Sequence, residues 1–262
     1  MGFLSKKSIL ITGISSKKSI AYGIAKVLKT HGANLALSFQ NERLREKVQK
    51  IAEEIDCSIV IPCDVSRTKE IENLFKILKK SWNTFDGIVH SIAFAPKNQL
   101  QGTYLDSITK DAFLKTHEIS AYSLSEMIKS SIHMFNKNFS AVTITYLGSE
   151  KVVQNYNVMG IAKASLEASV KYLSYSLGKL GFRINAISSG PIKTIAALGI
   201  KNFKKMLSSF KKICPLNRLV TIEEIGNTCL FLLSNLSSGI NGEIIHVDGG
   251  FNKLSPSLII EE

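Results

Sequence analysis

The chain has 262 residues, 45% hydrophobic and 21% charged, a composition typical of globular proteins and unlike that of disordered or collagen-like chains. A single α/β domain of this length is common, so we expect one domain over residues 1–262. The 33 basic and 21 acidic residues give a net charge of +12, but the lysines are spread over many segments and do not form the local stripe of a nucleic-acid-binding protein.

The cysteines and the N-terminus indicate a cytoplasmic protein. Cys57, Cys63, Cys214 and Cys229 form no CxxC pair, so reduced thiols are expected. The N-terminal MGFLSKK runs directly into an apolar stretch, which leaves no room for a signal peptide. No apolar run reaches the eighteen or so residues that a membrane span needs, so we expect no membrane association.

Short apolar runs alternate with longer segments of helical period, the pattern of βα units that build a parallel sheet. The predicted strands are Ser8–Thr12, Asn34–Ser38, Ser58–Pro62, Gly87–Ser91, Ala141–Tyr146, Arg183–Ser188 and Glu243–Val247. The predicted helices are Ser19–Thr30, Glu42–Ile55, Thr68–Trp82, Thr109–Lys129, Tyr156–Leu180 and Thr221–Leu233, the last with a capping box. Right-handed crossovers then predict a Rossmann-type, doubly wound α/β fold with seven parallel strands and helices on both faces.

Two stretches interrupt this alternation, Ala93–Ile108 after the fourth strand and Gly190–Pro215 after the sixth. Both follow the carboxyl ends of strands, where open α/β sheets bind their ligands. We therefore expect the second stretch, about residues 190–215, to be a substrate-binding loop and helix inserted into the domain.

The turn after the first strand is placed to present backbone N–H groups to a pyrophosphate, although a full GxGxxG motif is absent. Gly13 is expected where the backbone approaches a phosphate closely, and Ser19 can both cap the following helix and donate its hydroxyl. Gly13 alone is equally compatible with an ordinary βα connection.

The residues after the second and third strands are candidates to bind the adenosine half of a dinucleotide. Gln40 can bond a ribose hydroxyl but offers no charge to a 2′-phosphate, which favours NADH over NADPH, although Arg43 and Arg45 lie nearby. Asp64 and Val65 could receive the amine and the face of an adenine, whereas an Asp at the start of a loop is more often a turn residue.

Tyr156 and Lys163 are the candidate catalytic pair. They are seven residues apart, two helical turns, so we predict that they share a helix face and that the lysine lowers the phenol pKa. Tyr146 is predicted to end the fifth strand and to point into the same cleft. Each residue alone is more simply a packed tyrosine or a solvated lysine, but their joint position favours a catalytic site.

These motifs resemble the enoyl-acyl-carrier-protein reductases, a divergent family of short-chain dehydrogenase/reductases. The resemblance rests on the Tyr-x6-Lys spacing, a second tyrosine at the upstream position and a Gly-x5-Ser-x-Ala turn. It extends to the segments His90–Pro96, Ser189–Thr194 and His246–Phe251, and so covers nearly the whole chain. It implies an NADH-dependent reduction of the trans-2 double bond of enoyl thioesters, the last step of the fatty acid elongation cycle, by a homotetramer.

The resemblance also implies a role for each matching residue. Tyr156 would hydrogen-bond the enolate oxygen, Lys163 would hold the nicotinamide ribose, and Tyr146 would be either a proton donor or a wall of the cleft. Ala95 would border the substrate, and the segment Ile192–Met206 would close over the acyl chain. Dinucleotide contacts are implied for Gly13, Ser19, Ile20, Gln40, Asp64, Val65, Ile92, Lys163, Ile192, Lys193, Thr194, Ile195 and Ala196.

Two further expectations concern the rim of the site. The family usually has glycine where this chain has Ala93, which bears on how closely a ring can stack on the nicotinamide. Acyl carrier proteins are acidic, so Lys201, Lys204 and Lys205, predicted to lie in one helix beside the substrate portal, would steer them to the site. A solvated helix face is the plain alternative for these lysines.

Competing functions lack their motifs in this chain. A ketone or 3-oxoacyl reductase of the same fold would need a Tyr-x3-Lys pair, but position 160 is glycine. A basic nucleic-acid-binding protein would need clustered cations with stacking aromatic residues. No metal is expected, because the five histidines are far apart and lack the spacing of metal ligands.

Overall fold

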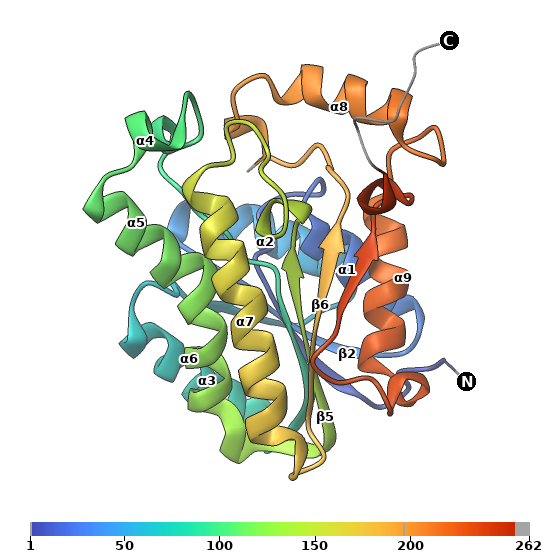
Figure 1. The fold of residues 1–262 in the computed structure, drawn as a ribbon. Coiled ribbons are helices and arrows are strands. Elements are labelled where there is room, and N and C mark those ends of the chain that lie inside the picture. The colour runs from blue at the N-terminus through green and yellow to red at the C-terminus, as the bar shows by residue number, and fades with distance from the viewer. Residues whose placement is uncertain (1, 196, 255–262) are drawn as a thin grey trace.

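Figure 1 shows the computed structural model of the protein, which describes residues 2–195 and 197–254. Its strands form one parallel sheet in the order β3-β2-β1-β4-β5-β6-β7. The strands are β1 Ser8–Thr12, β2 Asn34–Phe39, β3 Ile59–Pro62, β4 Phe85–His90, β5 Phe135–Thr145, β6 Arg183–Ser189 and β7 Ile244–Val247. The predicted doubly wound sheet is confirmed, and its order reverses between β1 and β4, where such folds open a ligand crevice.

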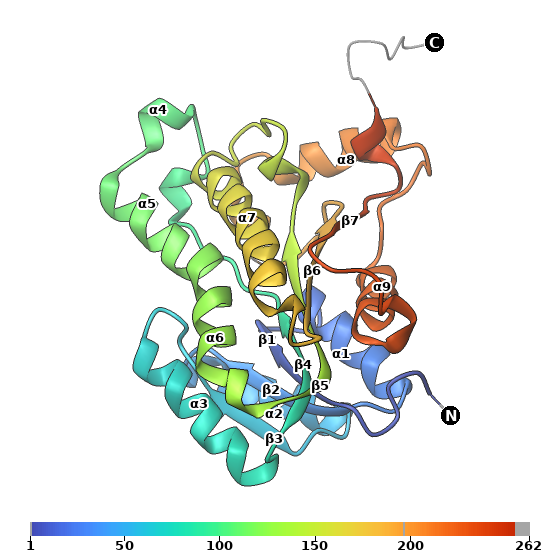
Figure 2. The same ribbon diagram turned by 60° about the horizontal axis from the view of Figure 1, so that its bottom comes forward.

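Helices cover both faces of the sheet, and each face has its own apolar core (Figures 1 and 2). The helices α1 Ile20–Thr30, α2 Glu42–Glu54 and α9 Ile222–Leu233 pack on one face. The helices α3 Thr68–Ser81, α6 Ser123–Ser131 and α7 Val158–Gly178 pack on the other. In the described part of the chain, no helix has the length and apolarity needed to cross a bilayer. All four cysteines are buried, free thiols, as predicted.

Two segments lie beyond the carboxyl ends of the central strands. One carries the short helix α4 Tyr104–Ser107 and leads into α5 Lys110–His117, and the other carries α8 Phe203–Ile213. In both views, α4 and α8 lie at the end of the molecule toward which β5 and β6 run (Figures 1 and 2). The two predicted interruptions of the βα pattern therefore cover the same edge of the sheet.

The predicted helix Thr109–Lys129 is divided. A π-helical segment, Glu118–Tyr122, joins α5 to α6. Ser120 within this segment is buried, accepts a hydrogen bond from the Phe94 N–H (3.0 Å) and donates one to the Phe94 carbonyl oxygen (3.0 Å). A π turn inserts one residue into the helical repeat, and periodicity does not reveal a side chain that bonds to a distant loop.

The fifth strand also differs from its predicted bounds, because β5 begins at Phe135 and not at Ala141. Asn138 within this extension has a positive φ of 67°. The strand nevertheless continues on both sides of it, with a register shift in its pairing to β4 between Phe85 and Gly87. An irregularity of this kind lets polar residues occupy a strand end.

Candidate active site

The turn between β1 and α1 brings two backbone segments very close together. Gly13 has a φ of 86°, and a Cβ at this position would collide with the carbonyl oxygen of Ser91. Only glycine fits such a close approach. Ser19 stands at the N-cap of α1, but its hydroxyl donates to the Ser16 carbonyl oxygen (2.6 Å) and forms no capping bond. The prediction that the Ser19 side chain caps this helix is therefore wrong. The Tyr22 N–H donates to the Ser19 carbonyl oxygen (3.1 Å), so the N–H groups of Ile20 and Ala21 are the ones that could face an anion.

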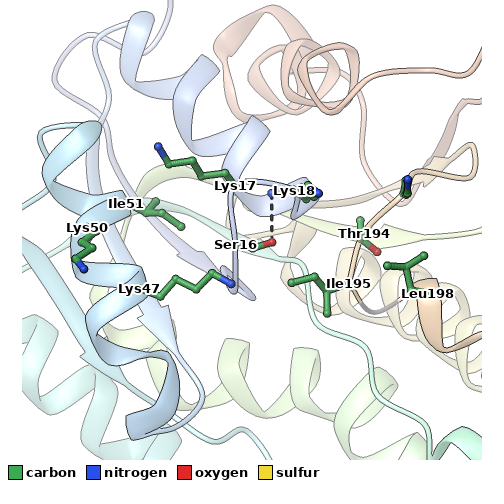
Figure 3. A pocket seen from close by; sticks show the side chains of 10 residues that line it. Ser16, Lys17, Lys18, Lys47, Lys50, Ile51, Thr194, Ile195 and Leu198 are labelled. Carbon is green, nitrogen blue, oxygen red and sulfur yellow. Dashed lines mark hydrogen bonds between the residues drawn. The ribbon is translucent and has the colours of Figure 1, made fainter.

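A pocket of about 470 Å³ opens beside this turn, between the turn, α2 and the segment after β6 (Figure 3). It is lined by Ser16, Lys17, Lys18, Lys47, Lys50, Ile51, Lys193, Thr194, Ile195 and Leu198. The structure thus brings three predicted dinucleotide contacts, residues 193–195, to the β1–α1 turn. Ile192 packs against the core, and Ala196 lies outside the described residues. The basic lining suits a ligand that carries phosphate.

Four other predicted dinucleotide residues lie beyond the carboxyl ends of β2, β3 and β4. Gln40 is exposed directly after β2, and Ile92 is half-buried after β4. The Asp64 carboxylate accepts hydrogen bonds from the Ser66 N–H (3.0 Å) and hydroxyl (2.8 Å), so it forms a turn whatever else it binds. Val65 packs against the core beside it.

Tyr156 lies in a turn and not in a helix, because α7 begins at Val158. The prediction that Tyr156 and Lys163 share one helix face is therefore wrong. The flanking Asn155 and Asn157 have positive φ angles of 64° and 41°. The buried Tyr156 ring meets the Tyr146 ring edge-on, with centroids 5.0 Å apart and an interplanar angle of 73°. The turn thus brings the side chains of the two candidate catalytic tyrosines into contact.

Two glycines allow this close packing. A Cβ at Gly148 would collide with the Tyr156 ring, and a Cβ at Gly160 would come within 2.6 Å of the Gly148 carbonyl oxygen. Sequence reasoning missed Gly148, because its contact with the Tyr156 ring arises only when the turn after Tyr146 packs against the start of α7. The crowding at position 160 leaves no room for a lysine, so the site cannot be rebuilt as the Tyr-x3-Lys pair of a ketone reductase.

Lys163 is buried in α7 at 4% exposure, and its ammonium donates to the Ile144 carbonyl oxygen at 2.7 Å. Burial lowers the pKa of Lys163 to about 8, and the charge of Glu167 opposes this shift. An ammonium has three donors. Two therefore remain for a ligand such as a ribose diol.

Burial dominates the acidity of both phenols. It raises the pKa of Tyr146 to about 12, with a further contribution from Asp248, and it raises the pKa of Tyr156, with contributions from Tyr146 and Glu167. The prediction that Lys163 would lower the Tyr156 pKa is wrong, because desolvation outweighs any nearby charge here. Both phenols are protonated at neutral pH and can donate hydrogen bonds.

His90, the last residue of β4, is fully buried. Its ring nitrogens lie 2.9 Å from the Thr143 hydroxyl and 2.9 Å from the Ser123 hydroxyl. Burial, together with the charge of Lys163, lowers the pKa of His90 to about 3. His90 is therefore neutral at physiological pH, and it joins β4, β5 and α6 instead of acting as an acid.

Glu167 is a buried residue of the site that sequence reasoning missed. Its carboxylate accepts hydrogen bonds from the hydroxyls of Thr145 (2.6 Å) and Ser149. These two hydroxyls flank Tyr146 along the chain, so Glu167 holds the turn that presents this phenol. The signal for it was its position four residues after Lys163 on the same helix face.

An apolar cluster adjoins the phenols. It comprises Leu100, Tyr156 and Met159, with Ala95, Tyr146, Val153 and Ile200 packed against them. The cluster joins three segments: residues 93–108, the Tyr156 turn and the residues before α8. It offers an apolar wall to a substrate chain. Ala93, two residues before Ala95 of this cluster, is exposed.

The three predicted docking lysines are all exposed. Lys204 and Lys205 lie in the first turn of α8, whereas Lys201 precedes the helix, so the expectation that all three share a helix is wrong. The Lys201 N–H instead donates to the Leu100 carbonyl oxygen (3.2 Å). Within residues 2–195 and 197–254, no group of three acidic, His or Cys side chains is placed to hold a metal ion.

Comparison with known proteins gives a consistent match over nearly the whole chain. The sequence profile of the family described as enoyl-(acyl carrier protein) reductase matches residues 13–252. The enoyl-acyl-carrier-protein reductase (NADH) of Escherichia coli K12 is 50% identical over 252 residues, which cover 96% of both chains.

Solved structures agree with this match. The enoyl-acyl-carrier-protein reductase (NADH) of Aquifex aeolicus VF5 has a TM-score of 0.95 at 43% identity and covers 97% of this chain and 99% of its own. The Anaplasma phagocytophilum enzyme, solved in complex with NAD, has a TM-score of 0.93 at 40% identity and covers 97% of each chain. The matched region contains both the Gly13 turn and the Tyr146–Tyr156–Lys163 group. The chain therefore belongs to the enoyl-acyl-carrier-protein reductase family of the short-chain dehydrogenase/reductases.

Proposed function

We propose that this protein reduces the trans-2 double bond of an enoyl chain carried on acyl carrier protein, with NADH as the reductant. The observation that carries this proposal is the group formed by the half-buried Tyr146 and the buried Tyr156 and Lys163 beyond the carboxyl end of β5. The chain is also 50% identical to an NADH-dependent relative. The reaction belongs to the last step of the fatty acid elongation cycle. When bound, the dinucleotide supplies a hydride to the β-carbon of the enoyl thioester.

The residues present fit such a dinucleotide, because the pocket beside the β1–α1 turn is lined by lysines that suit its phosphates. Gly13 allows the turn to pack against the Ser91 carbonyl oxygen. The α1 N-terminus would face the pyrophosphate, and Lys163 would hold the ribose hydroxyls with its two free donors. We assign dinucleotide contacts to Gly13, Ser19, Ile20, Gln40, Asp64, Val65, Ile92, Lys163, Ile192, Lys193, Thr194, Ile195 and Ala196. The neutral Gln40 supports NADH over NADPH.

Tyr156 would stabilise the transition state. As the hydride reaches the β-carbon, negative charge develops on the thioester oxygen, and the neutral Tyr156 phenol can donate a hydrogen bond to that oxygen. The pKa of Tyr156 is raised, so the phenol stays protonated throughout. Tyr146 packs edge-on against it and either donates a proton or forms the cleft wall. Ala95, in the adjoining apolar cluster, would border the acyl chain.

The rim of the site supports a carrier-protein partner. Lys201, Lys204 and Lys205 are exposed. They directly follow Ile200, which packs against the apolar cluster. Acyl carrier proteins are acidic, and exposed cations accelerate encounters with such partners over distances of about a Debye length. We therefore place carrier docking on these three lysines.

A homotetramer in the cytoplasm completes the proposal. Tyr172 and Tyr175 on α7 are 77% and 84% exposed, large aromatic areas that a monomer seldom leaves in water. Small residues beside them, including Ser165 and Ala168, line a shallow hollow in which another helix could pack. The four free, buried cysteines support a reducing compartment.

The decisive test compares substrates side by side. NADH absorbance is followed with crotonyl and acetoacetyl thioesters, each on acyl carrier protein and on coenzyme A. We expect turnover of the crotonyl thioesters and little of the acetoacetyl ones. Turnover of the acetoacetyl thioester alone would overturn the proposed reaction.

A further inference from the structure

The backbone of Asn157 has a conformation that suits glycine. Its φ of 41° and ψ of −121° correspond to the first central position of a type II′ turn, where a side chain is crowded. Asn157 is also the N-cap of α7, yet its side chain makes no capping hydrogen bond. A strained conformation of this kind persists where contacts from the surrounding structure hold it.

The Asn157 amide reaches across to the segment before and within α4. Its Nδ2 lies 3.1 Å from the Gln99 carbonyl oxygen and 3.2 Å from the Ser107 hydroxyl. The carbonyl oxygens of Gln101 and Gly102 are both 3.4 Å away. The amide has only two hydrogens, so the two shorter contacts are its principal bonds. One side chain thus holds both ends of residues 99–107.

Asn155, on the other side of Tyr156, makes the complementary contacts. It has a φ of 64° and is 6% exposed. Its Oδ1 accepts from the Gly102 N–H (3.0 Å), and its Nδ2 donates to the Lys201 carbonyl oxygen (3.4 Å). The Lys201 N–H in turn donates to the Leu100 carbonyl oxygen. Both segments that cover the site are therefore tied to the turn that carries Tyr156.

We propose that Asn155 and Asn157 are positioning residues that couple closure of the two covering segments over the acyl chain to the placement of the Tyr156 phenol. The inference rests on the proposed function. Leu100 and Ile200, one from each covering segment, lie in the same apolar cluster as the Tyr156 ring. A long acyl chain that fills this cluster pulls both segments inward, and the asparagines transmit that movement to the phenol. Binding energy from carbon atoms far from the reacting bond then raises kcat.

The test separates the amide from the backbone. Asn157→Gly keeps a residue suited to the φ and ψ of this position and removes only the amide, whereas Asn157→Ala also strains the backbone. The measurements are kcat and KM for four-carbon and twelve-carbon enoyl thioesters, the Kd for NADH by fluorescence, and Tm. Asn138→Gly is the matched control, since Asn138 also has a positive φ but is exposed near the start of β5.

For Asn157→Gly we expect the ratio of kcat for the twelve-carbon to the four-carbon substrate to fall about fivefold to tenfold, as the loss of one or two uncharged hydrogen bonds would produce. The NADH Kd and Tm should stay near wild type. Asn157→Ala should lower the ratio similarly and also lower Tm, and Asn138→Gly should change neither. An unchanged ratio in Asn157→Gly, or an equal loss of kcat on both substrates, overturns the coupling. Failure of the wild type to reduce either enoyl substrate would instead refute the proposed function.

Discussion

Lys163 and the lysines at the start of α8, which form the rim of the site, carry the same charge in opposite environments. Lys163 is 4% exposed, hydrogen-bonded to Ile144, and its pKa is lowered to about 8 by burial. Lys204 and Lys205 are exposed at the start of α8. In the buried region, low dielectric makes each contact strong and directional, whereas at the rim water and salt weaken it. Catalysis needs the first environment, and capture of a charged partner needs only the second.

The comparison predicts the largest effects in the buried region. Tyr156→Phe should lower kcat about 100-fold with little change in NADH Kd, because it removes a transition-state hydrogen bond that contributes about 2–4 kcal/mol. Lys163→Ala should lower kcat and NADH affinity together, because in the proposed site its donors would hold the ribose. Steady-state kinetics and NADH fluorescence titration measure both effects.

Lys171→Ala is the matched control for these variants, since Lys171 is exposed on the same helix, and it should leave both quantities unchanged. If Tyr156→Phe retained the wild-type rate with a long enoyl substrate, Tyr156 could not be the donor to the thioester oxygen. The buried region would then hold a structural tyrosine.

Ala93 is exposed and precedes Ala95 of the apolar cluster by two residues. Diphenyl-ether inhibitors are expected in this family to stack on the nicotinamide where glycine is usual. The extra methyl should weaken such binding, since overfilling a packed site costs about 1–3 kcal/mol. Ala93→Gly should therefore tighten inhibitor affinity roughly tenfold to a hundredfold, with substrate KM nearly unchanged, measured at saturating NAD⁺. Equal affinity in both forms would show that the backbone already accommodates the methyl group.

Smaller, salt-dependent effects are expected at the rim. The triple variant Lys201→Glu, Lys204→Glu, Lys205→Glu should raise KM for carrier-bound substrate about tenfold at low salt and leave coenzyme A thioesters nearly unaffected. The control reverses the same number of charges on α3, at the exposed Lys69, Lys76 and Lys80. Equal increases for both substrate types would exclude a docking role.

The smallest effect concerns the charge next to Lys163. Glu167 raises the pKa of Lys163 against the stronger effect of burial, so Glu167→Gln should lower that pKa below about 8. Lys163 is active when protonated, and activity is lost as pH rises through its pKa. The alkaline limb of kcat/KM should therefore move to lower pH, with a loss of a few fold near pH 8 and little change near pH 6. An unmoved limb would show that another group controls it.

Local patterns predicted much of this molecule. The apolar runs that became β1, β2 and β6 were placed within one residue of their observed ends, because fully buried parallel strands are continuous in hydrophobicity. The Thr221–Glu224 capping box is present, with the Glu224 N–H donating to the Thr221 hydroxyl at 3.1 Å. These features depend on neighbours within a few residues along the chain.

Non-local packing decided the rest. The π-helical segment at Glu118–Tyr122 and the start of α7 two residues after Tyr156 follow from contacts with distant loops. Periodicity therefore assigned Tyr156 to a helix. Asn157 shows the same limit, since its amide bonds Ser107, which lies fifty positions away along the chain.

The sequence by itself determined the doubly wound fold, the order of its elements and the residue types of the candidate site, because hydrophobic period, caps and the Tyr-x6-Lys spacing are local. Only the tertiary structure decided that Tyr156 stands in a strained turn, that Glu167 supports the Tyr146 turn, and that burial controls the pKa of Lys163 and both phenols. Desolvation and cross-chain hydrogen bonds depend on what surrounds a group in space, and that is set only when the sheet, α7 and the covering segments have packed together.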